Sequence, residues 1–223
     1  MSKYLLLFFI FLILIIILYC IYFHYNYENN INKRKSVDYK TRRKILINLY
    51  NIIIDAAEAT NTKPFLIYGT LLGFIRNKDL ICYDYDLDFG IENSQYDAIL
   101  QYLVNYIKNF PEYKIEVKDF LYYRNVEIIH IDTRLSADIS GFTLENNMYS
   151  RDVFKLYSRY YLKEKCVDIP KNWIMPLRFS TFLNRNTYVP NMPKKLLSCY
   201  YGKNFITPDH SCNSDCSVCT KIN

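Results

Sequence analysis

The stretch from Tyr83 to Ile91 constrains the fold of this chain most, because apolar and acidic side chains alternate along it. Successive side chains of a β-strand point to opposite faces, so one face would be apolar and the other would carry only carboxylates. The apolar positions are Tyr85, Leu87, Phe89 and Ile91, and the acidic positions are Asp84, Asp86 and Asp88. Such carboxylates repel each other unless a cation lies among them, and their oxygens suit Mg²⁺ or Mn²⁺. A half-buried strand with a solvated acidic face would show the same pattern.

The residues just before this strand favour a site that binds metal ions and phosphate. Phe65–Tyr68 is expected to form a short buried strand, and Gly69–Arg76 a tight turn that opens a helix. The first N–H groups of such a helix and the hydroxyl of Thr70 can hold a phosphate, while Gly69 allows its close approach. Metal ions held by the acidic strand would then bridge phosphate oxygens.

A third carboxylate is expected on a neighbouring strand. Asp138 lies between apolar residues in the short stretch Ser136–Ser140, which is typical of a strand. There it could bind a second metal ion or take a proton from an acceptor hydroxyl. Asp132 is the alternative, but the Thr133-Arg134 that follows it is more typical of a turn.

The segment Gly69–Arg76, then Lys78, then Tyr83–Asp88 resembles the signature of the LicD/fukutin family, which runs approximately GTLLGxxRxKGxIPWDDDID. The departures are Asp79 in place of a Gly, Cys82 of a Pro, Tyr83 of a Trp, and Tyr85 of the middle Asp. The two metal positions of the nucleotidyltransferase superfamily, Asp86 and Asp88, are intact. The later Ala137–Ile139 strand and the closing pattern of Pro190, Tyr201-Gly202 and Pro208 are also similar, so the resemblance covers about residues 45–208.

The resemblance implies an α+β fold, namely a nucleotidyltransferase domain with a polymerase-β-like mixed sheet flanked by helices. Members of the family move phosphocholine or ribitol phosphate from a CDP-activated donor to a sugar hydroxyl. We therefore expect a metal-dependent phosphotransferase with a CDP-alcohol donor, a glycan or glycoconjugate acceptor, and no nucleic acid partner.

The same resemblance implies roles for individual residues. Asp86, Asp88 and Asp138 would bind Mg²⁺ or Mn²⁺, and Asp138 could instead act as the base. Gly69, Thr70 and Lys78 would hold the donor. Arg76 would stabilise the charge that develops on the diphosphate and on the leaving CMP. Asp84 would support the metal ligands.

Two other functions are compatible with an Asp-x-Asp motif. A membrane-anchored, metal-dependent glycosyltransferase also uses this motif, but such folds place a larger nucleotide-binding unit before it than this chain has. That function also leaves the Gly69-Thr70 turn unexplained. The second alternative is a non-catalytic relative that only binds or scaffolds, and the presence of Asp86, Asp88 and Asp138 argues against it.

An apolar run at Tyr4–Phe23 carries no charge and is long enough to cross a bilayer as a helix. A cleaved signal peptide would need small residues before its cleavage site, and Leu18–Tyr22 has none. The predicted organisation is a short tail at 1–3, a transmembrane anchor at 4–23, a basic polar stem at 24–40, a LicD-like nucleotidyltransferase domain at 41–208 and a cysteine-rich tail at 209–223.

The features around this run point to opposite sides of the membrane. Lys and Arg cluster from Lys33 to Lys44, and the positive-inside rule would place them in the cytosol. A short N-terminal anchor before a catalytic domain is, however, a common layout of secretory-pathway transferases. We therefore expect a single-pass membrane protein with a lumenal domain. Much of the net charge of +6 lies in this cluster, so it does not imply nucleic acid binding.

The cysteines allow three interpretations. Cys20 lies in the apolar run, and the others are Cys82, Cys166, Cys199, Cys212, Cys216 and Cys219. Their even number suits a disulfide framework, which would favour an oxidising lumen. The segment from His210 to Cys219 could instead bind Zn²⁺, or the tail could have neither feature.

Overall fold

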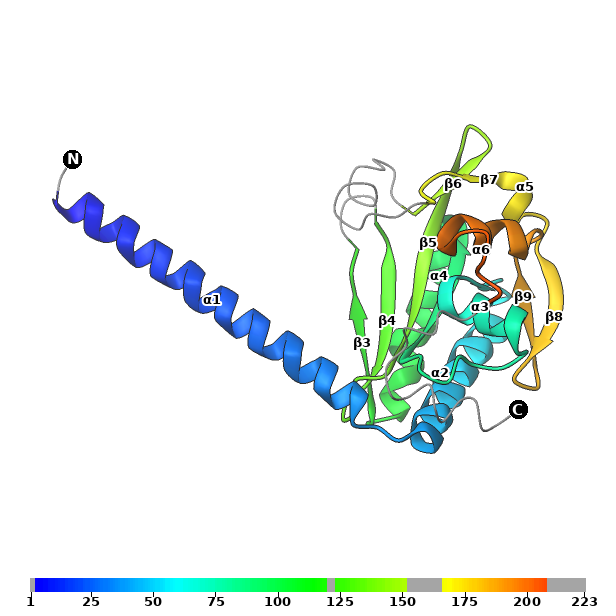
Figure 1. Cartoon of the computed structure of the whole chain (residues 1–223), viewed down its shortest axis with the longest axis horizontal. Coiled ribbons are helices and arrows are strands. Elements are labelled where there is room, and N and C mark those ends of the chain that lie inside the picture. Colours follow the sequence, from blue (N-terminus) through cyan, green and yellow to red (C-terminus); the bar gives the residue numbers. More distant parts are fainter. Residues whose placement is uncertain (1–2, 120–122, 152–165, 208–223) are drawn as a thin grey trace.

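The computed structural model, which describes residues 3–119, 123–151 and 166–207, brings strands from across the sequence into a mixed sheet (Figure 1). The strands are β1 (Phe65–Leu66), β2 (Asp86–Glu92), β3 (Tyr113–Val117), β4 (Asn125–His130), β5 (Ser136–Glu145), β6 (Met148–Ser150), β7 (Ile169–Pro170), β8 (Arg178–Phe182) and β9 (Arg185–Val189). Their order is β3-β4-β5-β2-β1-β9-β8, with β6 paired to β5 and β7 to β6. The pairs β2–β5 and β1–β9 are parallel.

The helices are α1 (Lys3–Lys35), α2 (Tyr39–Thr60), α3 (Tyr68–Arg76), α4 (Asn93–Tyr106), the 3-10 turn η1 (Ile107–Asn109), α5 (Lys171–Ile174) and α6 (Pro193–Tyr201). The sequence also predicts helices at 41–60, 95–108 and 194–201 and strands at 113–123 and 125–133, and α2, α4, α6, β3 and β4 fall there, as α3 and β5 fall where their segments were expected. The hairpin that the sequence predicts at 182–189 begins earlier, because β8 starts at Arg178 and pairs with β9. The elements β6, β7 and α5 lie between residues 144 and 174, where neither periodicity nor alternation allowed a prediction. The α+β class expected from the sequence is confirmed.

Helix α2 covers one face of the sheet and leaves the acidic face for the site. The Asp38 carboxylate caps it by accepting a hydrogen bond from the N–H of Thr41 at 3.0 Å, and Asn61 ends it in a left-handed conformation. Its apolar side packs on α4, β2 and β5. The ring of Tyr50 lies 5.9 Å from that of Phe89, between centroids. Phe89 and the apolar residues on its side of β2 therefore face α2, and the aspartates face away from it.

Strands β1 and β2 are shorter than the sequence predicts. Strand β1 ends at Leu66, because Tyr68 has a φ of 42° and begins α3. Strand β2 begins at Asp86 rather than near Tyr83, because the N–H of Asp84 donates to the carbonyl of Ile81 at 3.0 Å and closes a turn. The carboxyl of Asp84 thus approaches the site from a turn and not from the strand.

Helix α1 is 33 residues long and projects away from the sheet (Figure 1). It runs without a break through the segments expected to form the anchor and the stem. In the part of the chain that the structure describes, no helix is both long enough and apolar enough to span a bilayer. The transmembrane helix expected at residues 4–23 is therefore not supported.

Candidate active site

Asp86, Asp88 and Asp138 lie on one face of two adjacent parallel strands. Strands β2 and β5 pair in a register that sets Asp88 beside Asp138 and Asp86 beside Ser136. Residues paired in this way project to the same face, on strands about 4.8 Å apart. The register thus brings together the three carboxylates that the sequence singles out. Asp132 lies instead in an exposed turn before β5.

Glu127, which the sequence analysis missed, lies beside these carboxylates on β4. We call Asp86, Asp88, Asp138 and Glu127 the acidic row. Glu127 pairs with Asp138 in the β4–β5 register and is only 7% exposed. Lys118 donates to one of its carboxylate oxygens at 2.6 Å, and Arg34 lies 3.7 Å from the other. Asn125, also on β4, donates from Nδ2 to Asp138 at 2.7 Å. The alternation that predicts β4 already sets its polar side chains opposite its apolar ones, and this was the available signal.

Burial and the crowding of like charges raise the pKa of the aspartates in this row and of Asp84, which lies in the turn before β2. For Asp84 and Asp88 burial is the larger cause and repulsion from Asp86 the next, and both pKa values lie well above the ordinary value. Burial also raises the pKa of Asp86, although Arg34 opposes it. Burial raises the pKa of Asp138 to about 6. Positive charge placed among these groups would favour their ionised forms.

The start of α3 is joined to the acidic strand by close contacts. The hydroxyl of Thr70 accepts a hydrogen bond from the N–H of Asp88 at 2.8 Å, and the N–H of Ile67 donates to the Asp88 carbonyl at 3.2 Å. Gly69 faces Asp84, and a Cβ at position 69 would lie 2.6 Å from a carboxylate oxygen of Asp84. The structure therefore brings both Gly69 and Thr70 to the acids.

The structure does not bring Arg76 and Lys78 to the acids. Helix α3 has 9 residues, so its ends are about 12 Å apart along the axis. The Arg76 guanidinium donates to the carbonyl of Phe205 at 2.7 Å and to that of Thr207 at 3.3 Å. The Lys78 ammonium lies 3.9 Å from the ring centroid of Phe74. Both cations stabilise the far end of α3, which differs from the substrate-binding roles expected from the sequence.

Three arginines that the sequence analysis missed lie near the acids: Arg34, Arg42 and Arg151. Arg42, from α2, is 4% exposed. Arg151, just after β6, donates to the hydroxyls of Tyr68 at 2.9 Å and Tyr123 at 2.6 Å. Burial is the main effect on the pKa of Asp84 and Asp88, and it is opposed by Arg42 at Asp84 and by Arg151 at Asp88. These arginines come from separate parts of the chain, so spacing in the sequence does not reveal them.

Helix α6 adds aromatic side chains to the same region. The ring centroids of Tyr200 and Tyr68 lie 4.4 Å apart, which joins α6 to the first residue of α3. Burial, and then the nearby charge of Asp88, raise the pKa of Tyr201. The hydroxyl of Tyr201 is therefore within electrostatic reach of the acidic row.

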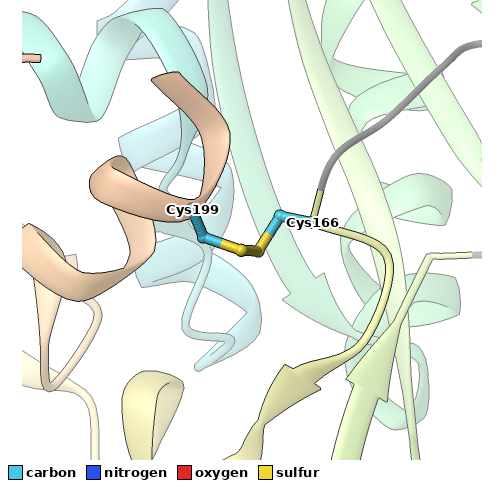
Figure 2. Close-up of a disulfide and its surroundings, with 2 residues drawn as sticks. All are labelled: Cys166 and Cys199. Atoms are coloured by element: carbon cyan, nitrogen blue, oxygen red, sulfur yellow. A yellow bond between two sulfur atoms is a disulfide. The ribbon is translucent and has the colours of Figure 1, made fainter. Parts of the chain in front are cut away.

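A disulfide holds α6 to the segment that leads into β7. Cys166 and Cys199 are bonded, with their Cα atoms 5.5 Å apart (Figure 2). Cys82, in the loop before β2, also takes part in a disulfide, and Cys20 is free. The disulfide interpretation is thus confirmed for Cys82, Cys166 and Cys199. The zinc interpretation concerns His210–Cys219 and lies outside the described residues.

The acidic face offers the type of ligand that Mg²⁺ or Mn²⁺ prefers, because its donors are carboxylate oxygens on adjacent strands. Over the described ranges, however, no three Asp, Glu, His or Cys side chains are close enough together to hold a metal ion as they stand. The donor type and the shared face of Asp86, Asp88 and Asp138 fit the expected ion, and binding would require these carboxylates to draw together.

Comparison with known proteins identifies the family. The family model "LicD/FKTN/FKRP, nucleotidyltransferase domain" matches residues 61–192. The chain belongs to the LicD family. The match includes α3, β2 and β5, and so the acids and the Gly69-Thr70 turn, whereas Arg34, Arg42 and Tyr201 lie outside it. LicD membership confirms the resemblance seen in the sequence and suggests a transferase. No curated protein matches the chain significantly.

Two solved structures share a distant likeness with this LicD protein. The solution structure of the antibiotic-resistance factor ANT(2″)-Ia has a TM-score of 0.44 and 11% identity, and the match covers 81% of this chain and 86% of that one. The crystal structure of ANT(2″)-Ia in complex with adenylyl-2″-tobramycin has a TM-score of 0.44 and 12% identity, with coverage of 79% and 89%. These likenesses are too distant to support an assignment, which rests on the family match.

Proposed function

We propose that this LicD-family protein is a metal-dependent phosphotransferase, which moves a phospho-alcohol such as phosphocholine or ribitol phosphate from a CDP-activated donor to a glycan hydroxyl. The observation that supports this most is the register that sets Asp88 beside Asp138, with Thr70 bonded to the backbone of Asp88. Phosphoryl transfer depends on positioning and charge stabilisation, and this arrangement provides acidic ligands next to a helix start.

In this proposal the start of α3 binds the donor phosphates. No side-chain hydrogen bond from Ile67 caps the helix, so the N–H groups of its first turn suit an anion. Arg151 lies near Asp88 and is held by the hydroxyls of Tyr68 and Tyr123. It takes the charge-stabilising role that the sequence analysis gave to Arg76.

Asp138 completes the metal site or accepts the proton of the acceptor hydroxyl in this proposal. Its pKa, which burial raises to about 6, suits a general base at neutral pH. Mg²⁺ or Mn²⁺ held by Asp86, Asp88 and Asp138 would neutralise charge on the donor phosphates and the leaving CMP. The protein's own part is to hold these carboxylates on one face and to bring the donor close to them.

A donor panel tests this function. The purified full chain is mixed with Mn²⁺, an oligosaccharide acceptor and either CDP-choline, CDP-ribitol, CDP-glycerol or a UDP-sugar, and nucleotide release is measured. We expect CMP release from at least one CDP-alcohol, and its loss in Asp86→Asn and Asp88→Asn. Asp132→Asn is the matched control, because Asp132 is an exposed carboxylate outside the acidic row. Wild-type rates in both site variants, or activity with the UDP-sugar alone, would contradict the proposal.

We also propose that the domain works in an oxidising lumen. The Cys166–Cys199 disulfide supports this compartment, because disulfides are rare in cytosolic proteins. Membrane attachment stays a prediction from the sequence. Protease protection and carbonate extraction of membranes from cells that make the full chain test both points. Digestion of the domain in intact vesicles would contradict the lumenal placement, and release of the chain by carbonate would contradict the membrane anchor.

A further inference from the structure

The last turn of α1 reaches the acidic face of the sheet through Arg34. Its Nε donates to the carbonyl of Arg134 at 2.7 Å, and its Nη2 lies 3.4 Å from the hydroxyl of Ser136. The same nitrogen lies 3.7 Å from the carboxylate of Glu127. The first two partners are 100 and 102 positions away in the sequence, so these contacts dock the end of α1 onto the folded domain.

These contacts set Arg34 beside Asp86. Ser136 is the residue paired with Asp86 in the β2–β5 register, so a guanidinium at the Ser136 hydroxyl lies on the acidic face next to Asp86. Figure 1 shows the end of α1 beside the ends of β3 and β4. The Arg34 side chain is 28% exposed, so a dissolved ligand can reach it.

The Arg34 guanidinium is held by the protein through two of its three nitrogens. An arginine has five N–H donors, and the contacts above use Nε and Nη2. Within the ranges that the structure describes, Nη1 makes no hydrogen bond. A guanidinium fixed in this way is prepared to bind phosphate oxygens, which accept parallel N–H donors from its planar fork.

A phosphate can bind next to the negatively charged aspartates only if a cation offsets their repulsion. A phosphate that approaches the aspartates is repelled, and the cations expected to offset this, Arg76 and Lys78, are bound at the far end of α3. Arg42 is 4% exposed and cannot meet a ligand without a rearrangement. Lys118 lies next to Asn125, at the end of β4 away from Asp86, and is paired with Glu127 at 2.6 Å. Lys114 and Lys118 are also exposed, but each donates to a glutamate, Glu116 or Glu127. Among the described residues, Arg34 differs from them in being held through two nitrogens while its Nη1 makes no hydrogen bond.

We propose that Arg34 binds a phosphate of the nucleotide diphosphate donor, so that the last turn of α1 forms one wall of the substrate site. This inference rests on the proposed phosphotransfer. Arg34 then holds the phosphates from the Asp86 side of the acidic row, while Arg151 holds them from the Asp88 side.

Binding measurements on the full chain test this role without turnover. Calorimetry with CDP and with pyrophosphate, in the presence and absence of Mn²⁺, gives the affinities. We expect Arg34→Gln to weaken both by about tenfold, since a hydrogen bond to a charged group is lost, and Arg34→Lys to recover part of the loss. With a CDP-alcohol that is turned over, the donor KM should rise by about the same factor, with kcat nearly unchanged.

Arg43→Gln is the matched control. Arg43 is also a partly exposed, ion-paired arginine near the start of the domain, but its partner is Asp79 at 3.1 Å, outside the acidic row. It should leave both affinities unchanged. Equal affinities in the wild type and Arg34→Gln, or a fall in kcat at unchanged affinity, would overturn the proposal.

Labelling of the wild-type chain keeps the test independent of whether Arg34→Gln folds. Pyrophosphate should slow the modification of Arg34 by phenylglyoxal, read by mass spectrometry, and should not slow that of Arg43. Equal modification of Arg34 with and without pyrophosphate would overturn the proposal. Protection of Arg34 in a chain that turns over no CDP-alcohol would refute the phosphotransferase function and leave the phosphate site standing.

Discussion

Asp88 and Asp138 stand side by side in a parallel strand pair, and each is held by a polar neighbour. The N–H of Asp88 donates to the hydroxyl of Thr70, and the carboxylate of Asp138 accepts a hydrogen bond from Asn125. Burial is the main cause of the raised pKa of Asp88, and Asp86 and Asp138 add to it. The metal-free protein therefore becomes less stable when both members of this pair are ionised.

The metal-free protein should lose stability as the pH rises through about 6. Burial raises the pKa of Asp138 to about 6 in the folded state from 3.8, so the folded state binds this proton more tightly than the unfolded state. The resulting stabilisation is complete below about pH 4 and is lost as the pH passes the folded-state value. Asp138→Asn should raise the melting temperature by about 5 °C near pH 7.5 and have little effect at pH 4. Thermal scans in EDTA measure this, and parallel curves for the two proteins at every pH would contradict it.

Gly69→Ala should destabilise the protein through Asp84. The new Cβ would lie 2.6 Å from a carboxylate oxygen of Asp84, so we expect a cost of about 1–3 kcal/mol in the free energy of unfolding. In an Asp84→Ala background the clash is gone, and alanine is the better helix former, so the same change should be neutral or stabilising. Urea denaturation of the four proteins gives the coupling energy. An equal cost in both backgrounds would show that the clash lies elsewhere.

Arg76→Gln should lower the stability of the protein, whereas Arg151→Gln should lower its turnover. Arg76 binds the carbonyls of Phe205 and Thr207, so its loss should lower the free energy of unfolding by about 1–2 kcal/mol and leave turnover by the folded protein close to wild type. Arg151 lies by Asp88, and its loss should lower CMP release by about tenfold or more. Turnover and denaturation measured on the same preparations separate the two effects. Loss of turnover in Arg76→Gln at wild-type stability would restore the role first expected for it.

Cys199→Ser should destabilise the protein, because it removes the disulfide that attaches α6 to the segment before β7. The Cys166–Cys199 disulfide closes a loop with a sequence separation of 33, so its loss should cost about 2–4 kcal/mol in the free energy of unfolding. Since α6 carries Tyr200 and Tyr201 to the site, the donor KM should also rise. Cys20→Ser is the control, because Cys20 is free and exposed. Denaturation curves of Cys199→Ser and wild type that coincide without reductant would rule out a stabilising bond.

The carboxylates of the site could be predicted because the few residues around each of them already show the pattern of a strand. Alternation alone places Asp86 and Asp88 on one face, and the apolar neighbours of Asp138 mark it as part of a strand. The same rule applied to β4 would have found Glu127. The pairing of Asp88 with Asp138 is a long-range register, and the sequence predicted only that their strands would be neighbours.

The cations could not be predicted, because their positions depend on how whole elements dock. Arg34 and Arg42 reach the acids from two helices that precede the sheet in the sequence, and Arg151 from the end of β6. Arg76 was expected at the site because it belongs to the same motif as Gly69. The length of α3 carries it away, since a helix separates its own ends by about 1.5 Å for every residue.

The site draws on both ends of the described chain, with Arg34 docked beside Asp86 and Tyr201 within reach of Asp88. Helix α2 and the strands up to β5 can pair while later segments are still being made, but the tyrosines of α6 arrive more than fifty residues after β5. A growing chain on the ribosome therefore lacks a complete site until α6 has been translated. If the proposed function holds, the protein cannot consume its donor while it is being made.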